Sequence, residues 1–261
     1  MISIVTITYN DFNGLKRTLS SIPDYNFIES VVINGGSDKA TIDFLSSHKG
    51  KVINEKDEGI ADAFNKGIVN SSGDAIMFLN SGDELVEAGY LKEAHEILNR
   101  NKEIDFVHSN LILIDSTGTE LYMKPSFFNL GRGLPYLHPT ILVRKSVFNQ
   151  IGLFNKEFKI AMDFDFVARL VKKDFSGHYI SDKAVVKMDG SGISVEKELD
   201  AIKECYISLK KNNFLNLKNY FGLMVRVVLF LLRKLMILIG LGGLLRNLKK
   251  KKHSFNRIAK L

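Results

Sequence analysis

The sequence contains a single cysteine, Cys205, among 261 residues. One thiol excludes an internal disulfide framework and a zinc cluster built on cysteine side chains. This composition fits a reducing, cytosolic compartment, where disulfides rarely persist. The first apolar run, "MISIVTITYN", has no basic segment ahead of it, so we expect no signal peptide.

Acidic residues are absent from the C-terminal part of the chain. Of the 36 Lys and Arg, 13 follow Glu204, whereas none of the 29 Asp and Glu does, so residues 1–204 carry a net charge of −6. A general nucleic-acid binder would place its basic patch on the folded domain. This charge distribution argues against a nucleic-acid partner, and it predicts a folded domain at 1–204 followed by a basic tail at 205–261.

A hydrophobic run long enough to span a bilayer is also missing. The longest uncharged run within the apolar stretch 219–253 is the 11-residue segment 235–245, and a spanning helix needs about 20 residues. A transmembrane hairpin that breaks at Gly240, Gly242 and Gly243 is the less favoured alternative.

The same stretch is amphipathic when it is drawn as a helix. The basic residues fall within one half of the helical wheel and leave a wide apolar face; they are Lys218, Arg226, Arg233 and Lys234. This pattern is typical of a helix that lies in the membrane interface, and the lysine run at 249–252 would add attraction to anionic lipids. A helix that packs against a partner subunit stays open as an alternative.

Short apolar strands alternate with helical segments in the first half of the chain. We expect strands at 2–9, 28–35, 51–55 and 75–80. The expected helices between them cover 14–22, 40–48 and 59–72. This alternation predicts an α/β domain with a mainly parallel sheet. In the second half we expect strands at 105–115, 134–148 and 177–189, with a short helix ending the second of these, and a helix at 160–173.

Polar residues gather where the expected parallel strands end. Ligands of such sheets bind outside the carboxyl ends of the strands. The stretch "AIMFLNSGDEL" (75–85) illustrates this, because an apolar strand runs directly into a small-residue turn that carries Asp83 and Glu84. Turn-forming residues alone explain such a sequence. The sharper interpretation is that the strand delivers a carboxylate to a binding cleft.

Seven short motifs occur in order along the chain, and together they resemble a known enzyme family. They are "TYN" near the start, "NGGSDKAT" (34–41), "DEGIADAFNKGI" (57–68), "FLNSGDEL" (78–85), "HPTILVRKSVF" (138–148), "MDFDFVARL" (162–170) and "GSGIS" (190–194). Residues 1–195 are similar to family 2 glycosyltransferases of the inverting GT-A type, in the branch that makes bacterial envelope polysaccharides. The resemblance implies a GT-A fold, a Rossmann-like and mainly parallel sheet flanked by helices.

The resemblance also implies the ligands and their distribution along the chain. It implies a nucleotide-sugar donor, a divalent cation (Mg²⁺ or Mn²⁺), and a sugar or lipid-linked saccharide as acceptor. Residues 1–100 would mainly bind the donor, and residues 101–204 would mainly bind the acceptor and supply the base.

The resemblance places a metal ligand at Asp83. A divalent ion acts as a Lewis acid on the leaving diphosphate of a nucleotide sugar. The stretch "NSGD" (80–83) is similar to the aspartate cluster of the family but keeps one carboxylate. One carboxylate together with the donor phosphates can hold Mg²⁺, which usually retains several waters. His138 matches a histidine position of this branch, which implies metal ligation or contact with the diphosphate; a structural histidine is the alternative.

Asp163 is the candidate general base. Inversion is a single displacement, so a base must take the proton of the acceptor hydroxyl. In the family this base is an aspartate six residues before an arginine at a helix start, and Asp163 and Arg169 match that spacing, with Met162 where many relatives have glutamate. Asp165 is the second candidate. Both carboxylates are alternatively explained as helix N-terminal acids that interact with the macrodipole.

The remaining matches concern the donor. Thr8, Tyr9 and Asn34 match family positions at the ends of the first two strands, and Ser37 belongs to the same motif as Asn34. Asn34 replaces the usual aspartate that faces a pyrimidine, and an amide still offers uracil a donor and an acceptor. The segment that lies over the donor in relatives corresponds here to Asp57, Asn65 and Lys66. A solvated helix face is the alternative interpretation of this segment.

Taken together, the sequence predicts a hexosyl- or N-acetylhexosaminyl-transferase of bacterial surface polysaccharide synthesis. A UDP-sugar is the favoured donor, the acceptor is lipid-linked or an oligosaccharide, and the tail would hold the enzyme peripherally on the cytoplasmic face of the inner membrane. One alternative is a nucleotidyltransferase, although "TYNDFNGLKR" lacks the glycine-rich basic loop that grips a triphosphate. The other is an inactive module that binds nucleotide sugars, which the reduced aspartate motif would fit.

Overall fold

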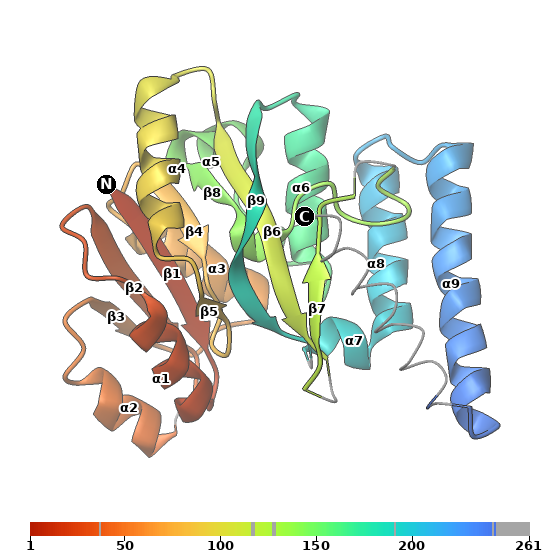
Figure 1. Ribbon diagram of the computed structural model, residues 1–261, viewed down its shortest axis with the longest axis horizontal. Helices are drawn as coiled ribbons and strands as arrows, with labels where there is room; N and C mark the ends of the chain where they lie inside the picture. The colour runs from red at the N-terminus through yellow and green to blue at the C-terminus, as the bar shows by residue number, and fades with distance from the viewer. Residues whose placement is uncertain (37, 116–117, 127–128, 191, 242, 244–261) are drawn as a thin grey trace.

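The chain builds one mixed β-sheet from short apolar strands (Figure 1). The computed structural model describes residues 1–243 apart from 37, 116–117, 127–128, 191 and 242. Within these residues the strands lie in the order β3-β2-β1-β4-β8-β6-β9-β5, and β7 pairs with β6. The strands are β1 (Ile2–Thr8), β2 (Ile28–Asn34), β3 (Lys51–Asn54), β4 (Ala75–Phe78), β5 (Glu84–Leu85), β6 (Phe106–Ile114), β7 (Glu120–Met123), β8 (Leu142–Arg144) and β9 (Gly177–Asp189).

Strand direction brings several strand ends to one edge of the sheet. Strands β1 to β4 are parallel to their neighbours. Strand β8 is antiparallel to both β4 and β6, and β9 is parallel to β6. Consequently β1, β4, β6 and β9 run in the same direction, and their carboxyl ends meet at a common edge. This is the edge where ligands of parallel sheets bind.

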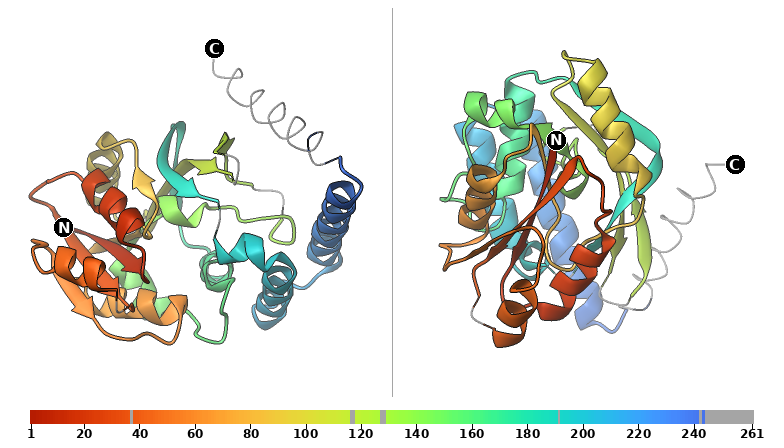
Figure 2. Two further views of the ribbon diagram at one scale, coloured as in Figure 1. Left: turned by 90° about the horizontal axis from the view of Figure 1, so that it is seen from below. Right: turned by 90° about the vertical axis from the view of Figure 1, so that its left-hand side faces the viewer.

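Helices cover both faces of the sheet because successive strand residues point to opposite faces. On β1, Val5 packs with the apolar cluster of one face and Ile4 with that of the other. Figure 2 shows α4 on one side of the sheet and α5 and α6 on the other. The helices up to this point are α1 (Phe12–Ser21), α2 (Lys39–Leu45), α3 (Ile60–Asn70), α4 (Gly89–Arg100), α5 (Lys145–Ile151) and α6 (Met162–Lys172), with a 3₁₀ helix η1 (His138–Thr140).

The predicted α/β class with a mainly parallel first half is confirmed, and most expected elements lie within two or three residues of the observed ones. The expected strand at 134–148 is much shorter, because only β8 forms there, between η1 and α5. Pro135 and Pro139 lack the N–H group that a strand ladder requires. The sequence reasoning did not identify α4, β5 or β7, nor the helices at Ile193–Glu196 and Glu198–Lys211.

The C-terminal helices pack against the body of the protein. They are α7 (Ile193–Glu196), α8 (Glu198–Lys211) and α9 (Leu217–Leu238). Helix α8 buries Cys205 and Leu209 against Phe164 and Ala168 of α6. The predicted boundary between residues 204 and 205 therefore falls inside a continuous helix, and the change in packing comes after Lys211.

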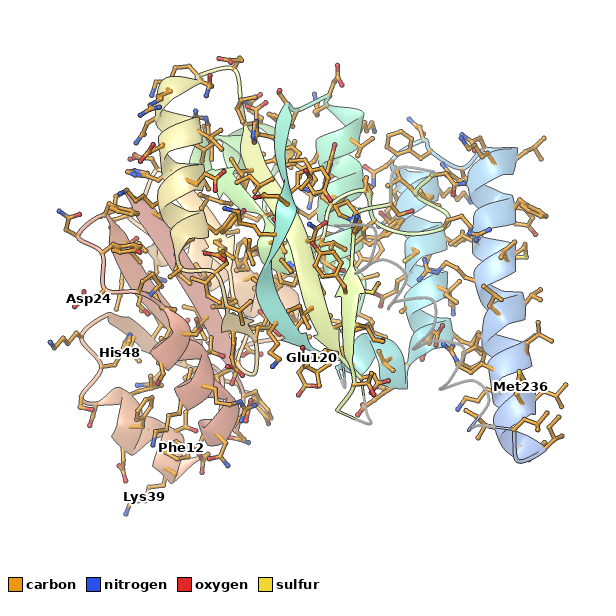
Figure 3. All side chains as sticks on the ribbon, viewed as in Figure 1. Phe12, Asp24, Lys39, His48, Glu120 and Met236 are labelled. Carbon is orange, nitrogen blue, oxygen red and sulfur yellow. The ribbon has the colours of Figure 1, made fainter. Side chains whose placement is uncertain are left out.

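Only one face of α9 is attached to the body. Leu223 is buried in the same apolar cluster as α8, and the Asn219 side chain accepts a hydrogen bond from the N–H of Gly131 at 3.2 Å. Gly222 lies so close to this loop that a Cβ atom there would be 2.8 Å from the Gly131 carbonyl carbon. Figure 3 shows side chains standing out from α9 on the side away from the sheet.

No helix among the described residues is both long enough and apolar enough to cross a bilayer. Helix α9 ends at Leu238, and Gly240 follows with a φ of +80°, a conformation that favours glycine. Gly242 and the lysine run at 249–252 lie outside the described residues.

Candidate active site

A cleft of about 780 Å³ opens at the edge where β1, β4 and β9 end. Its walls come from segments that are far apart in the sequence. They are the end of β1 with Thr8 and Tyr9, the turn at 80–83, η1 with His138, the start of α6 with Asp163, and the end of β9 with Asp189. The location follows the rule that applies to parallel sheets, since each wall continues from a strand end or a helix start.

Asp83 lies at the bottom of a turn that glycine makes possible. Gly82 has a φ of +96°, which a residue with a side chain rarely adopts. The turn leaves Asp83 only 4% exposed, and its carboxylate accepts a hydrogen bond from the N–H of Asp189 at 3.3 Å. Burial raises the pKa of Asp83 to about 7, and the nearby Asp189 carboxylate adds to the increase. Binding of a cation would relieve both penalties.

Few protein ligands for a metal are present at this point. Asp83 and Asp189 supply two carboxylates, and the buried Asn80 Oδ1 has no hydrogen-bond partner. Among the described residues, three or more His, Cys, Asp or Glu side chains do not gather in any group that would hold a metal ion. A cation here would need phosphate oxygens and water to complete its coordination, which is the usual situation for Mg²⁺.

His138 lines the cleft and is surrounded by aromatic rings, an aromatic cage of which Phe64 also lines the cleft. Its ring centroid is 5.5 Å from those of Phe64 and Phe78, 5.7 Å from that of Phe154 and 6.4 Å from that of Phe166. Burial among these rings lowers the pKa of His138 to about 4, so the imidazole is neutral at pH 7. Its Nε2 atom has no hydrogen-bond partner. A neutral imidazole is the form that ligates metals, and the predicted metal role stays a prediction.

Asp163 is the second residue of α6 and is half-buried at the cleft. Its carboxylate accepts the N–H of Phe164 at 2.7 Å. Burial raises the pKa of Asp163 to about 6, the charge of Arg226 from α9 opposes this increase, and the charge of Glu204 from α8 adds to it. A carboxylate with a pKa near the working pH is suited to general base catalysis.

Asp165, the second candidate for the base, does not line the cleft. Its carboxylate accepts hydrogen bonds from Arg169 Nε at 2.9 Å, Ser208 Oγ at 2.9 Å and Asn212 Nδ2 at 3.1 Å. These contacts bind α6 to α8. The two acids of the helix start are therefore separated, because Asp163 faces the cleft and Asp165 the interior.

The predicted donor-binding residues divide into two groups. Thr8, Tyr9 and Asp57 line the cleft, and Thr8 Oγ1 is buried without a hydrogen-bond partner. Asn34 is buried at the end of β2, where its amide donates to Asn54 Oδ1 at 3.0 Å and its oxygen accepts the N–H of Gly36 at 3.1 Å. Ser37 lies outside the described residues.

Asn65 and Lys66 do not line the cleft. The Asn65 amide makes two hydrogen bonds with the backbone of Phe154, at 2.9 Å each. Lys66 pairs with Glu55 at 3.0 Å and with Asp62 at 3.6 Å. These contacts hold α3 to neighbouring segments, and the predicted contacts of both residues with the donor stay a prediction.

Two cleft residues were missed by the sequence reasoning. Asp189 ends β9 directly before the "GSGIS" motif, so the rule of polar strand ends would have identified it had it been applied to that strand. Asp11 caps α1 by accepting the N–H of Gly14 at 2.9 Å, and it also accepts the Ser81 hydroxyl at 2.7 Å. The cap was readable from sequence, whereas the contact with Ser81 depends on the sheet order.

Comparisons with solved structures place this arrangement among GT-A glycosyltransferases. S. aureus TarS 1-349 in complex with UDP-GlcNAc aligns with a TM-score of 0.61 and 19% identity, over 80% of this chain and 66% of that chain. The mannosyltransferase PcManGT from Pyrobaculum calidifontis, in complex with GDP-Man and Mn²⁺, aligns with a TM-score of 0.62 and 14% identity, over 97% of this chain and 83% of that chain. At these identities the likeness concerns the fold.

Sequence comparison gives the family. The chain belongs to the family "Glycosyl transferase family 2", whose profile matches residues 3–176. An uncharacterized glycosyltransferase of Mycobacterium tuberculosis is 29% identical over 178 residues, which are 64% of this chain and 68% of the relative. A PGL/p-HBAD biosynthesis glycosyltransferase of Mycobacterium bovis is 27% identical over 180 residues, covering 65% and 69%. The chain is thus an enzyme, a glycosyltransferase, as predicted, and it spans about two thirds of the length of these relatives.

Replacement of Asp83 tests the metal site. Asp83→Asn removes the charge from the turn, and we expect turnover to fall at least about 100-fold if a cation on this carboxylate stabilises the leaving group. The stabilisation of the protein by Mn²⁺ plus UDP in a thermal unfolding assay should also disappear. Glu84→Gln is the matched control, because Glu84 is the neighbouring carboxylate and forms a surface ion pair with Arg17 at 3.7 Å. Near wild-type turnover of Asp83→Asn at limiting metal would contradict the assignment.

Proposed function

We propose that the enzyme is an inverting glycosyltransferase that moves a sugar from a nucleotide-diphosphate sugar to a lipid-linked or oligosaccharide acceptor in bacterial surface polysaccharide synthesis. One observation carries the proposal: a single cleft contains two carboxylates of raised pKa, Asp83 and Asp163, on separate elements. One is suited to the leaving-group side of a displacement and the other to the attacking side.

A nucleotide-sugar donor is supported by the solved neighbours and by the cleft. The neighbours contain UDP, UDP-GlcNAc or GDP-Man. In this chain the unpartnered Thr8 hydroxyl and the exposed ring of Tyr9 lie at the end of β1 beside the cleft. We favour a UDP-sugar, because two of these three neighbours are complexes with UDP or UDP-GlcNAc. The buried Asn34 amide is bonded to Asn54 and Gly36 and does not line the cleft.

Asp83, Asp189 and Asn80 are the residues that would hold Mg²⁺ or Mn²⁺. Two carboxylates and an unpaired amide oxygen form an all-oxygen donor set, which suits these hard cations. The bound cation would supply Lewis-acid stabilisation of the departing diphosphate. His138 with its free Nε2 stands in the same cleft as a further candidate ligand.

Asp163 would take the proton from the attacking hydroxyl. With a pKa of about 6, most of this carboxylate is deprotonated at pH 7 and ready to accept a proton. Its position at the start of α6 keeps it fixed, because the helix is packed against the sheet on one side and α8 on the other.

The acceptor end of the cleft is largely aliphatic. Its lining includes Leu111, Leu113, Leu134, Met188 and Ile193, from β6, β9 and the segments around them. Such a wall favours an acceptor that carries an apolar part beside its sugar or hydroxyl. A lipid-linked acceptor meets this requirement, and the mycobacterial relatives named for PGL/p-HBAD biosynthesis also fit glycolipid chemistry.

Helix α9 supports attachment to a membrane surface. A row of exposed apolar side chains runs along the face opposite the body, at alternating spacings of four and three residues: Leu217, Phe221, Met224, Val228, Leu231, Leu235 and Leu238. No acidic residue follows Glu204. An apolar row flanked only by positive charge matches an anionic lipid surface better than a second copy of the same row, which would bring like charges together. We therefore infer a peripheral position on the cytoplasmic face of the inner membrane.

The function is tested by Asp163→Asn after a thermal-shift screen of UDP- and GDP-sugars with Mn²⁺ has identified the donor. We expect donor binding to persist and nucleotide release to fall by about 10²- to 10⁴-fold, the typical contribution of a general base. Asp24→Asn, an exposed change in the loop between α1 and β2 at the left-hand edge of the molecule (Figure 3), is the control. Loss of donor binding with intact residual turnover would instead assign Asp163 a structural role.

Membrane attachment is tested by Leu231→Glu and Leu235→Glu on vesicles of phosphatidylglycerol and of phosphatidylcholine. Each substitution should weaken binding to anionic vesicles at least about tenfold, because it removes an apolar contact and adds a repelled charge. Val69→Glu provides the control, as Val69 is an exposed apolar residue of α3.

High salt should partly release the wild-type protein. Retention through high salt and alkaline carbonate would indicate a transmembrane segment, and a dimer that binds no vesicles would indicate helix pairing.

A further inference from the structure

The segment that leads into α6 is held by a residue from another helix. Ala161 occupies the N-cap position and has no side chain that accepts a hydrogen bond. The N–H groups of Lys159, Ile160 and Ala161 instead donate to the carboxylate of Glu204, at 3.0, 2.9 and 2.8 Å. The first N–H groups of a helix and its approach lack intrahelical partners. One carboxylate of α8 therefore fixes the three residues that lead into α6.

This segment belongs to the wall of the cleft. Ile160 and Met162 line the cleft on either side of Ala161, and Asp163 comes directly after Met162. Since three consecutive backbone groups are held, the direction in which α6 begins is set by Glu204. That direction determines where the Asp163 carboxylate lies in the cleft.

Arg226 of α9 reaches the same region. It is half-buried, and its positive charge acts on Asp163 and on Cys205, which follows Glu204 in the chain. Helix α9 is held in place on either side of Arg226. Leu223 packs into the same apolar cluster as α8, and Arg233 forms an ion pair with Glu198. A positive charge from α9 and a negative charge from α8 thus flank the start of α6.

We propose that Glu204 is a positioning residue for the transfer reaction, which acts by holding residues 159–161 so that Asp163 faces the acceptor. Arg226 brings the opposite charge to the same carboxylate. The proposal rests on the proposed function, because it requires Asp163 to be the base. Both residues lie beyond residues 3–176, the region that the family profile matches. The C-terminal helices thereby complete the site besides offering a surface to a membrane.

The charged groups around Asp163 define a specific signature. Glu204 faces it from α8 and Arg226 from α9. On its own helix, Asp165 is neutralised by Arg169. Across the cleft stand Asp83 and Asp189, whose charges a bound cation would offset, and the neutral His138. Loss of the Glu204 charge should lower the pKa of Asp163, and loss of the Arg226 charge should raise it.

The first test uses Glu204→Gln in the full-length protein, assayed as nucleotide release from the donor identified in the screen across pH 4.5–9 (roughly one and a half units below to three above the Asp163 pKa). Gln keeps one acceptor oxygen for three N–H groups. We expect kcat to fall about 10- to 100-fold, the range for a slightly misplaced catalytic group, while the KM for the donor stays unchanged. The acid limb of the pH–rate profile, where activity rises with pH, should move to lower pH. Asp200→Asn removes a charge one turn away on the exposed side of α8 and should leave rate and profile unchanged.

The second test uses Arg226→Gln and Arg226→Lys. It also tests the proposal if the Glu204→Gln variant does not fold. Arg226→Gln should displace the acid limb to higher pH, and Arg226→Lys should restore it. Opposite displacements in the Glu204 and Arg226 variants support the proposal, because a merely structural loss lowers the rate equally at every pH. An unchanged acid limb in both, while Asp163→Asn is inactive, overturns the proposal and leaves the proposed function standing. If Asp163→Asn remains active, the proposed function itself fails.

Discussion

Two carboxylates, Asp83 and Asp163, are withdrawn from water within the same cleft, and the rest of the site depends on this one constraint. An ionised side chain loses hydration when it is buried, and the loss appears as the raised pKa of Asp83 and of Asp163. The fold tolerates these groups because rigid elements hold each one. A glycine turn and the N–H of Asp189 hold the first, and the start of α6, which follows the residues that Glu204 binds, holds the second. Their separation on different elements allows them to do different chemical work.

The C-terminal helices connect this constraint to the surface of the protein. Helix α8 contacts the start of α6 through Glu204 and its first turns through Ser208 and Asn212. Helix α9 attaches to α8 by one face and leaves its opposite, apolar face exposed. A membrane that engages the exposed face would therefore lie close to the helices that contact α6, which carries the proposed base.

Local sequence signals were sufficient for the elements whose pattern is set by their own residues. Strand β1 is readable from "ISIVTIT". The end of a buried strand in a turn drew attention to Asp83, but its assignment as a metal ligand came from the family resemblance. Asp163 came from family resemblance, since α6 has two similar acids and only packing separates Asp163 from Asp165. The aromatic rings around His138 and the contacts of Glu204 with residues 159–161 depend on strand order and helix packing, whereas Asp189 was readable as a polar strand end but was not identified. Charge counting placed a boundary at residue 204, because charged residues mark only the exposed side of a helix. The buried side of α8, with Cys205 and Leu209, continues past this position.

The pH dependence of kcat/KM for nucleotide release by the wild-type enzyme, at saturating Mn²⁺, tests the central claim most directly. If the buried carboxylate of Asp163 is the base, activity must rise with pH as that group loses its proton, with a midpoint near its pKa of about 6. The same midpoint should be absent from the residual activity of Asp163→Asn. A rate that stays constant down to pH 4.5, or an acid limb that the Asp163→Asn variant retains, would contradict the account.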